Sequence, residues 1–198
     1  MKVVVAIGYN RKESFCYNGI INTILETLND HDIEYTFIDL YEDGFHPSGR
    51  GNIPELIEKY QKVLCEATHH IFVSPVYWGR CTSMLEGMFD LVMTTNVAYR
   101  FKHLFGVYGM PIPLWKDKKM ITFLTHGGPA SVIYTLYVNA IALRLDLGFA
   151  TFIYGWFRSS IIQFFSVPFV TDEKRKKMLN KTRKRVEYEI KKWNKKHK

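Results

Sequence analysis

The chain has 198 residues, of which 47% are hydrophobic and 23% are charged. These values are typical of one folded globular domain, and they exclude a disordered or collagen-like chain. Three cysteines without a CxxC pair exclude a disulfide framework and a compact metal site, so we expect a reducing compartment and no bound metal. The net charge of +8 is concentrated at one end. Residues 171–198 carry 13 basic and 4 acidic side chains, which leaves 14 basic and 15 acidic residues before them.

Short apolar runs alternate with helical patterns along the chain. Strands are expected at Lys2–Gly8, Glu34–Leu40, His69–Ser74, Lys119–Thr125 and Phe149–Gly155. Helices are expected at Ser14–Asn29, Ile53–Ala67, Ser83–Thr94, Ser131–Leu147 and about Thr171–Trp193. Strands that are apolar almost throughout require cover on both faces, as in a parallel sheet between helices. We therefore predict one α/β domain over residues 1–198, with a doubly wound five-stranded parallel sheet.

Two further segments have a distinct composition. The connection from about 95 to 118 is too long for an ordinary loop, and we expect a lid or a dimer interface there. Its large side chains are Tyr99, Phe101, Phe105, Tyr108, Met110 and Trp115. The basic segment from about 171 to 198 has an apolar stripe at helical spacing, so we expect it to dock on the sheet and expose its lysines. The stripe consists of Leu179, Val186, Ile190 and Trp193.

The sequence predicts neither a membrane span nor a signal peptide. The longest uncharged run, Met120–Leu143, is interrupted by the Thr125–Pro129 segment, which a membrane helix would not hold at mid-depth. The chain begins directly in the apolar run Val3–Ile7, without a basic leader. We therefore expect a cytoplasmic protein.

In open parallel sheets, ligands bind beyond the carboxyl ends of the strands, so the loops that follow the strands are the candidate binding segments. The loop from Gly8 to Cys16 has no GxGxxG or GxxxxGK motif. Ser14 can cap the next helix. The free amides at the start of that helix, together with Arg11, would suit a phosphate. An ordinary capped helix with solvated charges explains the same residues equally well.

Two other loops offer groups for a planar, partly anionic ligand. Tyr77 and Trp78, between Pro75 and Gly79, can line a ring, although such aromatics are more often core or interface residues. The Thr125–Pro129 loop offers unobstructed amides for an anionic edge, or is a plain tight turn. His126 is a candidate proton donor there, with a structural role as the alternative.

The three loops follow the expected strand ends in chain order, and together they indicate a resemblance to a known family. The chain resembles the flavodoxin-like NAD(P)H:quinone oxidoreductases and the related NADPH-dependent FMN reductases over nearly its whole length. The matching stretches are Gly8–Phe15, Asp39–Tyr41 with Phe45, Ser74–Gly79, Leu85–Gly87 with Asp90, Ala98–Tyr99, and Lys118–Lys119 leading to Thr125–Pro129.

The resemblance implies a flavodoxin-like fold and a homodimer with a flavin in each interface-lined pocket. It implies that the first loop holds the phosphate, that the second lies along the ring with donors toward N5 and O4, and that the third meets N1 and O2. The cofactor-binding residues it implies are Tyr9, Arg11, Ser14, Phe15, Cys16, Pro75, Val76, Tyr77, Trp78, Gly79, Thr125, His126, Gly127 and Gly128.

Three positions depart from the family pattern. Tyr9 stands where the quinone reductases commonly have a histidine that helps to hold the pyrophosphate of FAD, so we expect FMN rather than FAD. Asp90 is followed by Leu91 in place of the frequent arginine, which removes one polar support. Only Cys65 lies where iron–sulfur relatives carry a cysteine cluster, so no cluster is expected.

The function expected from the resemblance is hydride transfer from NADPH or NADH through FMN to a quinone or another small acceptor, by a ping-pong scheme. Tyr134 and His126 are the candidate proton donors, and Tyr99, Phe101 and Trp115 are expected on the opposite pocket wall. One alternative is a flavodoxin-type electron carrier that meets protein partners. The other alternative is a module that binds nucleic acid or a membrane through the basic helix. The leading interpretation involves neither nucleic acid nor a membrane.

Overall fold

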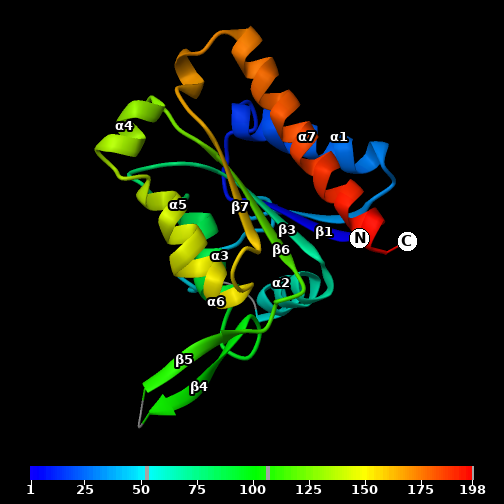
Figure 1. The fold of residues 1–198 in the computed structure, drawn as a ribbon, viewed down its shortest axis with the longest axis vertical. Helices are drawn as coiled ribbons and strands as arrows, with labels where there is room; N and C mark the ends of the chain where they lie inside the picture. Colours follow the sequence, from blue (N-terminus) through cyan, green and yellow to red (C-terminus); the bar gives the residue numbers. More distant parts are fainter. Residues whose placement is uncertain (52–53, 106–107, 198) are drawn as a thin grey trace.

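A five-stranded sheet forms the centre of the molecule, and the computed structural model describes residues 1–51, 54–105 and 108–197. The strands lie in the order β2-β1-β3-β6-β7 (Figure 1). All neighbouring pairs are parallel, which confirms the predicted doubly wound sheet. The strands are β1 (Lys2–Ile7), β2 (Glu34–Asp39), β3 (His69–Pro75), β6 (Lys119–Thr125) and β7 (Ser159–Phe164).

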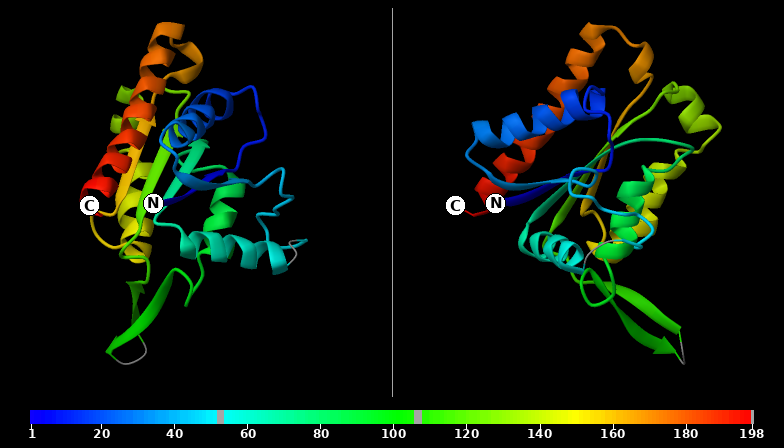
Figure 2. Two further views of the ribbon diagram at one scale, coloured as in Figure 1. Left: turned by 90° about the vertical axis from the view of Figure 1, so that its right-hand side faces the viewer. Right: turned by 180° about the vertical axis from the view of Figure 1, so that it is seen from behind.

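Helices cover both faces of this sheet (Figure 2). Side chains alternate along β1, so Val3, Val5 and Ile7 enter one core while Val4 and Ala6 enter the other. The first face carries a π-helical turn (Phe15–Ile21), α1 (Asn22–Asp30) and α7 (Asp172–Lys196). The second face carries α2 (Pro54–Glu66), α3 (Ser83–Val92), α5 (Ala140–Leu145) and α6 (Thr151–Ile153). Ile53, the predicted start of the second helix, lies outside the described residues.

The fifth strand was predicted in the wrong place. Residues 146–153 form a π-helical turn and α6, and the fifth strand is β7. Ala150, Ile153 and Tyr154 are buried at helical spacing, while Phe152 between them is 37% exposed. A short apolar run cannot distinguish a strand from a buried helix by its periodicity alone.

The predicted helix Ser131–Leu147 is interrupted. The chain forms α4 (Ala130–Thr135) and α5, and between them Val138 and Asn139 both adopt left-handed backbone, with φ of 48° and 49°. A β-branched residue rarely takes this conformation, so the break is strained. It turns the chain beside the carboxyl ends of the strands, where α4 lies (Figure 1).

The long connection forms a projecting hairpin of β4 (Tyr99–Phe105) and β5 (Tyr108–Pro113). It lies at the amino end of β6, opposite α4 and away from the carboxyl-end loops of the same chain (Figure 1). The expected lid or dimer interface stays a prediction. Trp115 is only 3% exposed and packs edge-on against His70 and Tyr154, not on a pocket wall. The side chains of Phe105 and Tyr108 lie outside the described part of the chain.

The C-terminal helix α7 packs beside α1, as the apolar stripe predicts (Figure 1). Thr182, Val186 and Ile190 are buried against the first core, and Leu179 is partly buried there. Its N-cap is Thr171, whose side chain accepts a hydrogen bond from the Lys174 amide. Most of the helix's lysines stay exposed, so a packing role accounts for its amphipathic pattern.

One buried histidine gives the fold a predicted dependence on pH. Nε2 of His70 donates to the Leu64 carbonyl at 2.9 Å, and Nδ1 accepts from the Tyr154 hydroxyl at 2.7 Å. Burial lowers the pKa of His70 from its ordinary 6.5 to about 3. The unfolded chain gains this proton near pH 6.5 and the folded chain resists it, so the free energy of unfolding falls as the pH drops through this window.

We expect this one residue to cost about 2 kcal/mol of stability between pH 7 and pH 5, at about 1.4 kcal/mol per pH unit below 6.5. Denaturant unfolding at both pH values, for the wild type and His70→Gln, measures the effect. The variant should lose less stability on acidification, although His69, with a pKa of about 4, still contributes in both proteins. Equal losses in the two proteins would show that His70 titrates normally in the folded state.

Candidate functional site

The loops after β1, β3 and β6 converge on a cavity of about 780 Å³. The chain adds β2 on one side of β1 and then β3 on the other side, so the order of the strands reverses at β1. Ligands of open parallel sheets bind beside such a reversal. The cavity brings together ten of the predicted residues from three separate loops. They are Tyr9, Ser14, Phe15, Cys16, Pro75, Val76, Tyr77, Thr125, His126 and Gly127.

The loop after β1 presents backbone amides to this cavity. Ser14 Oγ accepts a hydrogen bond from the Tyr17 amide at 3.2 Å and so caps the helical turn. The amides of Phe15 and Cys16 are in the first turn, where they have no intrahelical acceptor, and both residues line the cavity. This arrangement suits an anion. Arg11 is exposed and is not among the lining residues, so its predicted phosphate contact stays a prediction.

Cys16 connects the first loop to the third. Its buried thiol lies 3.0 Å from Thr125 Oγ1 at the end of β6. Burial raises the pKa of the Cys16 thiol to about 12, so the thiol stays protonated and is a poor nucleophile. The contact fixes the relative position of two cavity walls.

The loop after β3 is a tight turn. Tyr77 and Arg80 exchange two backbone hydrogen bonds of 3.0 Å, and the corner residues Trp78 and Gly79 have φ of 50° and 73°. Gly79 takes this conformation without cost, whereas Trp78 is strained. The Trp78 side chain is 92% exposed, so in the single chain its ring packs against almost nothing.

His126, after β6, is only 2% exposed. Its Nε2 donates to Gln163 Oε1 at 2.9 Å, and its ring stacks on Phe165. Burial lowers the pKa of His126, and the bond to Gln163 opposes this effect only in part. The imidazole is therefore neutral near pH 7 with its one proton already bonded, which argues against the predicted proton donation. Nδ1 has no partner among the described residues.

A second cavity of about 210 Å³ adjoins the first, and the two share Val76, His126 and Gly127. Trp78, Gly79 and Gly128 from the predicted set line only this smaller cavity. The rest of its wall comes from α4, α5 and their break. These residues are Val132, Ile133, Tyr137, Ala140 and Ile141.

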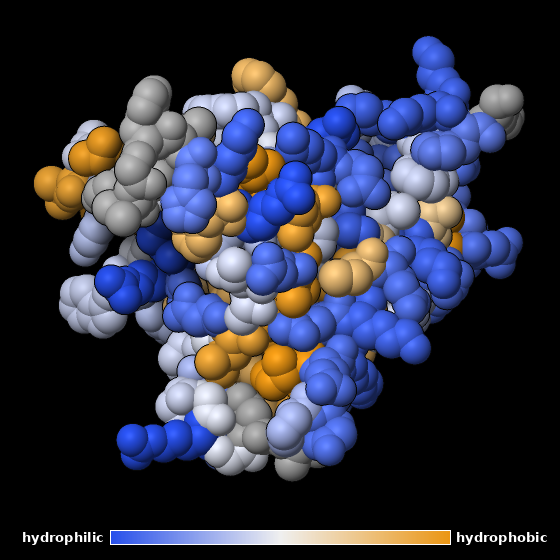
Figure 3. Space-filling model, turned by 90° about the horizontal axis from the view of Figure 1, so that it is seen from below, coloured by the Kyte–Doolittle hydropathy of each residue, from blue (hydrophilic) through white to orange (hydrophobic). Residues whose placement is uncertain are grey.

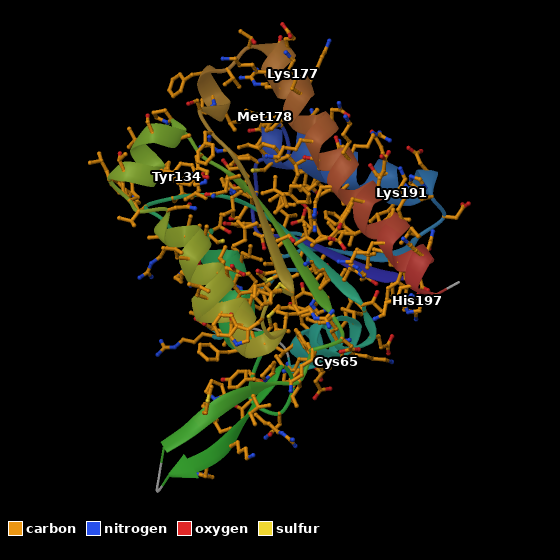
Figure 4. The ribbon with its side chains drawn as sticks, viewed as in Figure 1. Cys65, Tyr134, Lys177, Met178, Lys191 and His197 are labelled. Carbon is orange, nitrogen blue, oxygen red and sulfur yellow. The ribbon has the colours of Figure 1, made fainter. Side chains whose placement is uncertain are left out.

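Tyr134, the other predicted proton donor, lies on α4 at the carboxyl end of the sheet (Figure 4). Its ring is half exposed and packs against Phe165, and it is not among the lining residues of either cavity. Tyr137, three residues further along the chain, lines the smaller cavity instead. Tyr137 directly precedes the strained break at Val138 and Asn139.

The sequence prediction missed the cationic side of the large cavity. Arg175 and Lys176, in the first turns of α7, line it. Arg175 is engaged with Asp172 and the Val167 carbonyl, whereas Lys176 has no ion pair in the described part of the chain. These cations belong to the basic run that the sequence predicted to be solvated.

Comparison with known proteins identifies the family. A family model described as a flavodoxin-like fold matches residues 1–186. The chain belongs to this flavodoxin-like family. None of the curated proteins compared with the sequence matches it. No helix in the described ranges is long and apolar enough to cross a membrane.

Solved structures share the flavodoxin-like fold at low sequence identity. Smu.1420 from Streptococcus mutans UA159 has a TM-score of 0.78 and 21% identity, over 94% of this chain and 98% of that one. The NAD(P)H:quinone oxidoreductase of Methanothermobacter marburgensis has 0.74 and 17%, over 94% and 95%. The FMN-dependent NADH-azoreductase of Bacillus anthracis str. Ames Ancestor, in complex with FMN, has 0.70 and 16%, over 97% and 98%.

The joined cavities of this flavodoxin-like chain have the chemistry that a flavin requires. The larger one offers first-turn amides and Lys176 for a phosphate, although the carboxylates of Glu13 and Asp172 also line it. The smaller one offers mainly apolar walls for a ring. A Cβ added to Gly127 would meet no atom within 4 Å, so this glycine faces open space where the two cavities meet.

Proposed function

We propose that this protein binds FMN across the two joined cavities and transfers electrons from NADPH or NADH to a quinone or another small acceptor. The observation that carries the proposal is the junction at Val76, His126 and Gly127, where a large cavity of mixed lining, with first-turn amides in its wall, meets a smaller and mainly apolar one. An amphipathic cofactor with a phosphate and a flat ring fits this pair. The names of two proteins with the same fold, an FMN-dependent NADH-azoreductase and an NAD(P)H:quinone oxidoreductase, support the same chemistry.

The residues have separate tasks in this proposal. The amides of Phe15 and Cys16 hold the phosphate, with Arg175 and Lys176 supplying positive charge nearby. The Pro75–Gly79 turn and the amides of Gly127 and Gly128 position the ring, and fixed amide dipoles stabilise negative charge at its edge. FMN, when bound, supplies the chemistry by taking a hydride from the nicotinamide and passing electrons to the acceptor.

In this proposal Tyr137 supplies the proton, in place of the expected donors His126 and Tyr134. The His126 proton is bonded to Gln163, and Tyr134 packs away on Phe165. Tyr137 lines the smaller cavity, is 44% exposed and has a hydroxyl that is free in the described part of the chain. We propose that it donates to the acceptor or relays a proton from water.

We also propose a homodimer that works in the cytoplasm. Large apolar side chains stand exposed around the smaller cavity, and grouped exposure of this kind marks an interface. They are Trp78, Leu136, Tyr137, Val138 and Leu143. At the hairpin end, hydrophobic side chains also reach the surface between hydrophilic ones (Figure 3). On the hairpin itself, Phe101 and Met110 are exposed. Three free cysteines fit a reducing compartment.

Steady-state kinetics test the proposal. In this proposal nicotinamide and acceptor use the same exposed flavin face, so the two bind in turn. Double-reciprocal plots of NADPH or NADH oxidation at several quinone concentrations should therefore give parallel lines, as in a ping-pong scheme. Intersecting lines would show that both substrates bind at once, and would contradict the shared pocket.

A further inference from the structure

One carboxylate connects the two walls of the smaller cavity. The first wall is the turn after β3, which contributes Trp78 and Gly79, and the second is α5, which contributes Ala140 and Ile141. Glu86, on α3, is not among the lining residues of either cavity. Its Oε1 atom accepts a hydrogen bond from each wall, so it can act on the cavity only through the groups that it holds.

The first of these bonds holds the end of the strained turn. The Cys81 amide donates to Glu86 Oε1 at 3.0 Å, directly after the backbone pair of Tyr77 and Arg80 that closes the turn. Strained backbone such as that of Trp78 persists only where its surroundings fix it. Since the Trp78 side chain is 92% exposed, the constraint comes from the backbone on either side of it, and Glu86 supplies part of that constraint.

The second bond holds α5. Arg144 lies one helical turn after Ala140 and Ile141 and therefore on the same side of α5. Its guanidinium donates to the same Oε1 atom of Glu86, and this ion pair joins α5 to α3, which lies beside it (Figure 1). The side chains of Arg144 and Glu86 are 43% and 22% exposed, so water screens the pair only in part.

The two bonds together fix the separation of the cavity walls. A flat ring gains dispersion energy only where both walls touch it, and a gap of less than 1 Å already loses much of that energy. Resting on the proposed function, we infer that Glu86 and Arg144 are positioning residues, which hold the Trp78 turn and α5 at the separation that the flavin ring requires.

Matched arginine variants test this inference. Arg144→Met removes the ion pair and keeps a long side chain. Arg183→Met is the control, because Arg183 is similarly exposed but pairs with Glu26 and Asp30, between α7 and α1. Affinities for FMN and riboflavin are measured by quenching of flavin fluorescence, and thermal melting of the same samples measures stability. No turnover is needed, so the result is independent of activity.

Arg144→Met should weaken the binding of FMN and of riboflavin by the same factor, about 3- to 10-fold, because both ligands have the same ring. Glu86→Gln should do the same, since its amide oxygen still accepts from Cys81 but no longer carries the charge that pairs with Arg144. The double variant should bind no more weakly than either single one. Arg183→Met should change neither affinity, although its melting temperature should fall about as much as that of Arg144→Met.

Three results would overturn the inference. Affinities in Arg144→Met equal to those in Arg183→Met would show that the ion pair only stabilises the fold. A loss confined to FMN would show that the arginine acts on the phosphate through its charge. Losses that add in the double variant would show that Glu86 and Arg144 act separately. In all three cases the proposed flavin function still stands, whereas a wild type that binds neither flavin would reject the proposed function itself.

Discussion

Replacing Gly127 with leucine is expected to weaken FMN binding strongly and leave the fold intact. Gly127 lies where the two cavities meet, its φ is not positive, and an added Cβ would meet no atom within 4 Å. A leucine therefore fits the backbone but occupies the space of the ligand. Overpacking costs about 1 to 3 kcal/mol, so the affinity for FMN should fall about 10- to 100-fold.

Flavin fluorescence titration and thermal melting, carried out on the same samples, measure the two halves of this prediction. Gly148→Leu is the matched control, because that glycine also has room for a side chain, with Arg144 Cγ the nearest atom at 3.9 Å, and it lines neither joined cavity. The control should bind FMN normally. Normal FMN affinity in Gly127→Leu would place the flavin elsewhere.

Replacing Trp115 with alanine should destabilise the fold by about 3 to 5 kcal/mol, the range for removing a buried large aromatic side chain. Trp115 is 3% exposed, with ring centroids 5.0 Å from His70 and 5.7 Å from Tyr154. Denaturant unfolding measures the loss. FMN affinity of the folded protein at low temperature should not change, because the ring is not in the pocket wall.

Trp156→Ala removes the same side chain from a position that is 65% exposed. It should cost under about 1 kcal/mol, since surface substitutions have small effects. Similar losses of stability in the two variants would mean that Trp115 does not pack in the core as described.

Most of the fold was predictable because buried parallel strands are apolar almost throughout. β1, β2, β3 and β6 were found within one residue at each end. β7 was missed because Ser159, Ser160 and Gln163 dilute its apolar pattern, while the neighbouring helical turn has an apolar run. The break between α4 and α5 depends on the left-handed backbone of Val138 and Asn139. The sequence around these two residues does not predict that conformation.

The site was predictable only where it lies next in sequence to a strand end. The loops containing Phe15, Tyr77 and Gly127 follow their strands directly, so the sheet topology brings them together. Lys176 reaches the same cavity from the last helix, and no local pattern indicates that. Trp115 was expected on the pocket wall but packs on His70 and Tyr154. The direction in which the neighbouring hairpin projects depends on contacts with residues far away in the sequence, and no local pattern predicts those contacts.

The most direct test of the account is anaerobic mixing of the FMN-loaded protein with NADPH, and separately with NADH, while the visible absorbance of the flavin is followed. We expect at least one of the two nicotinamides to bleach the flavin in a single turnover, and a quinone added afterwards to restore the colour. Absorbance that persists with both nicotinamides, while dithionite removes it readily, would contradict the account and favour an electron carrier.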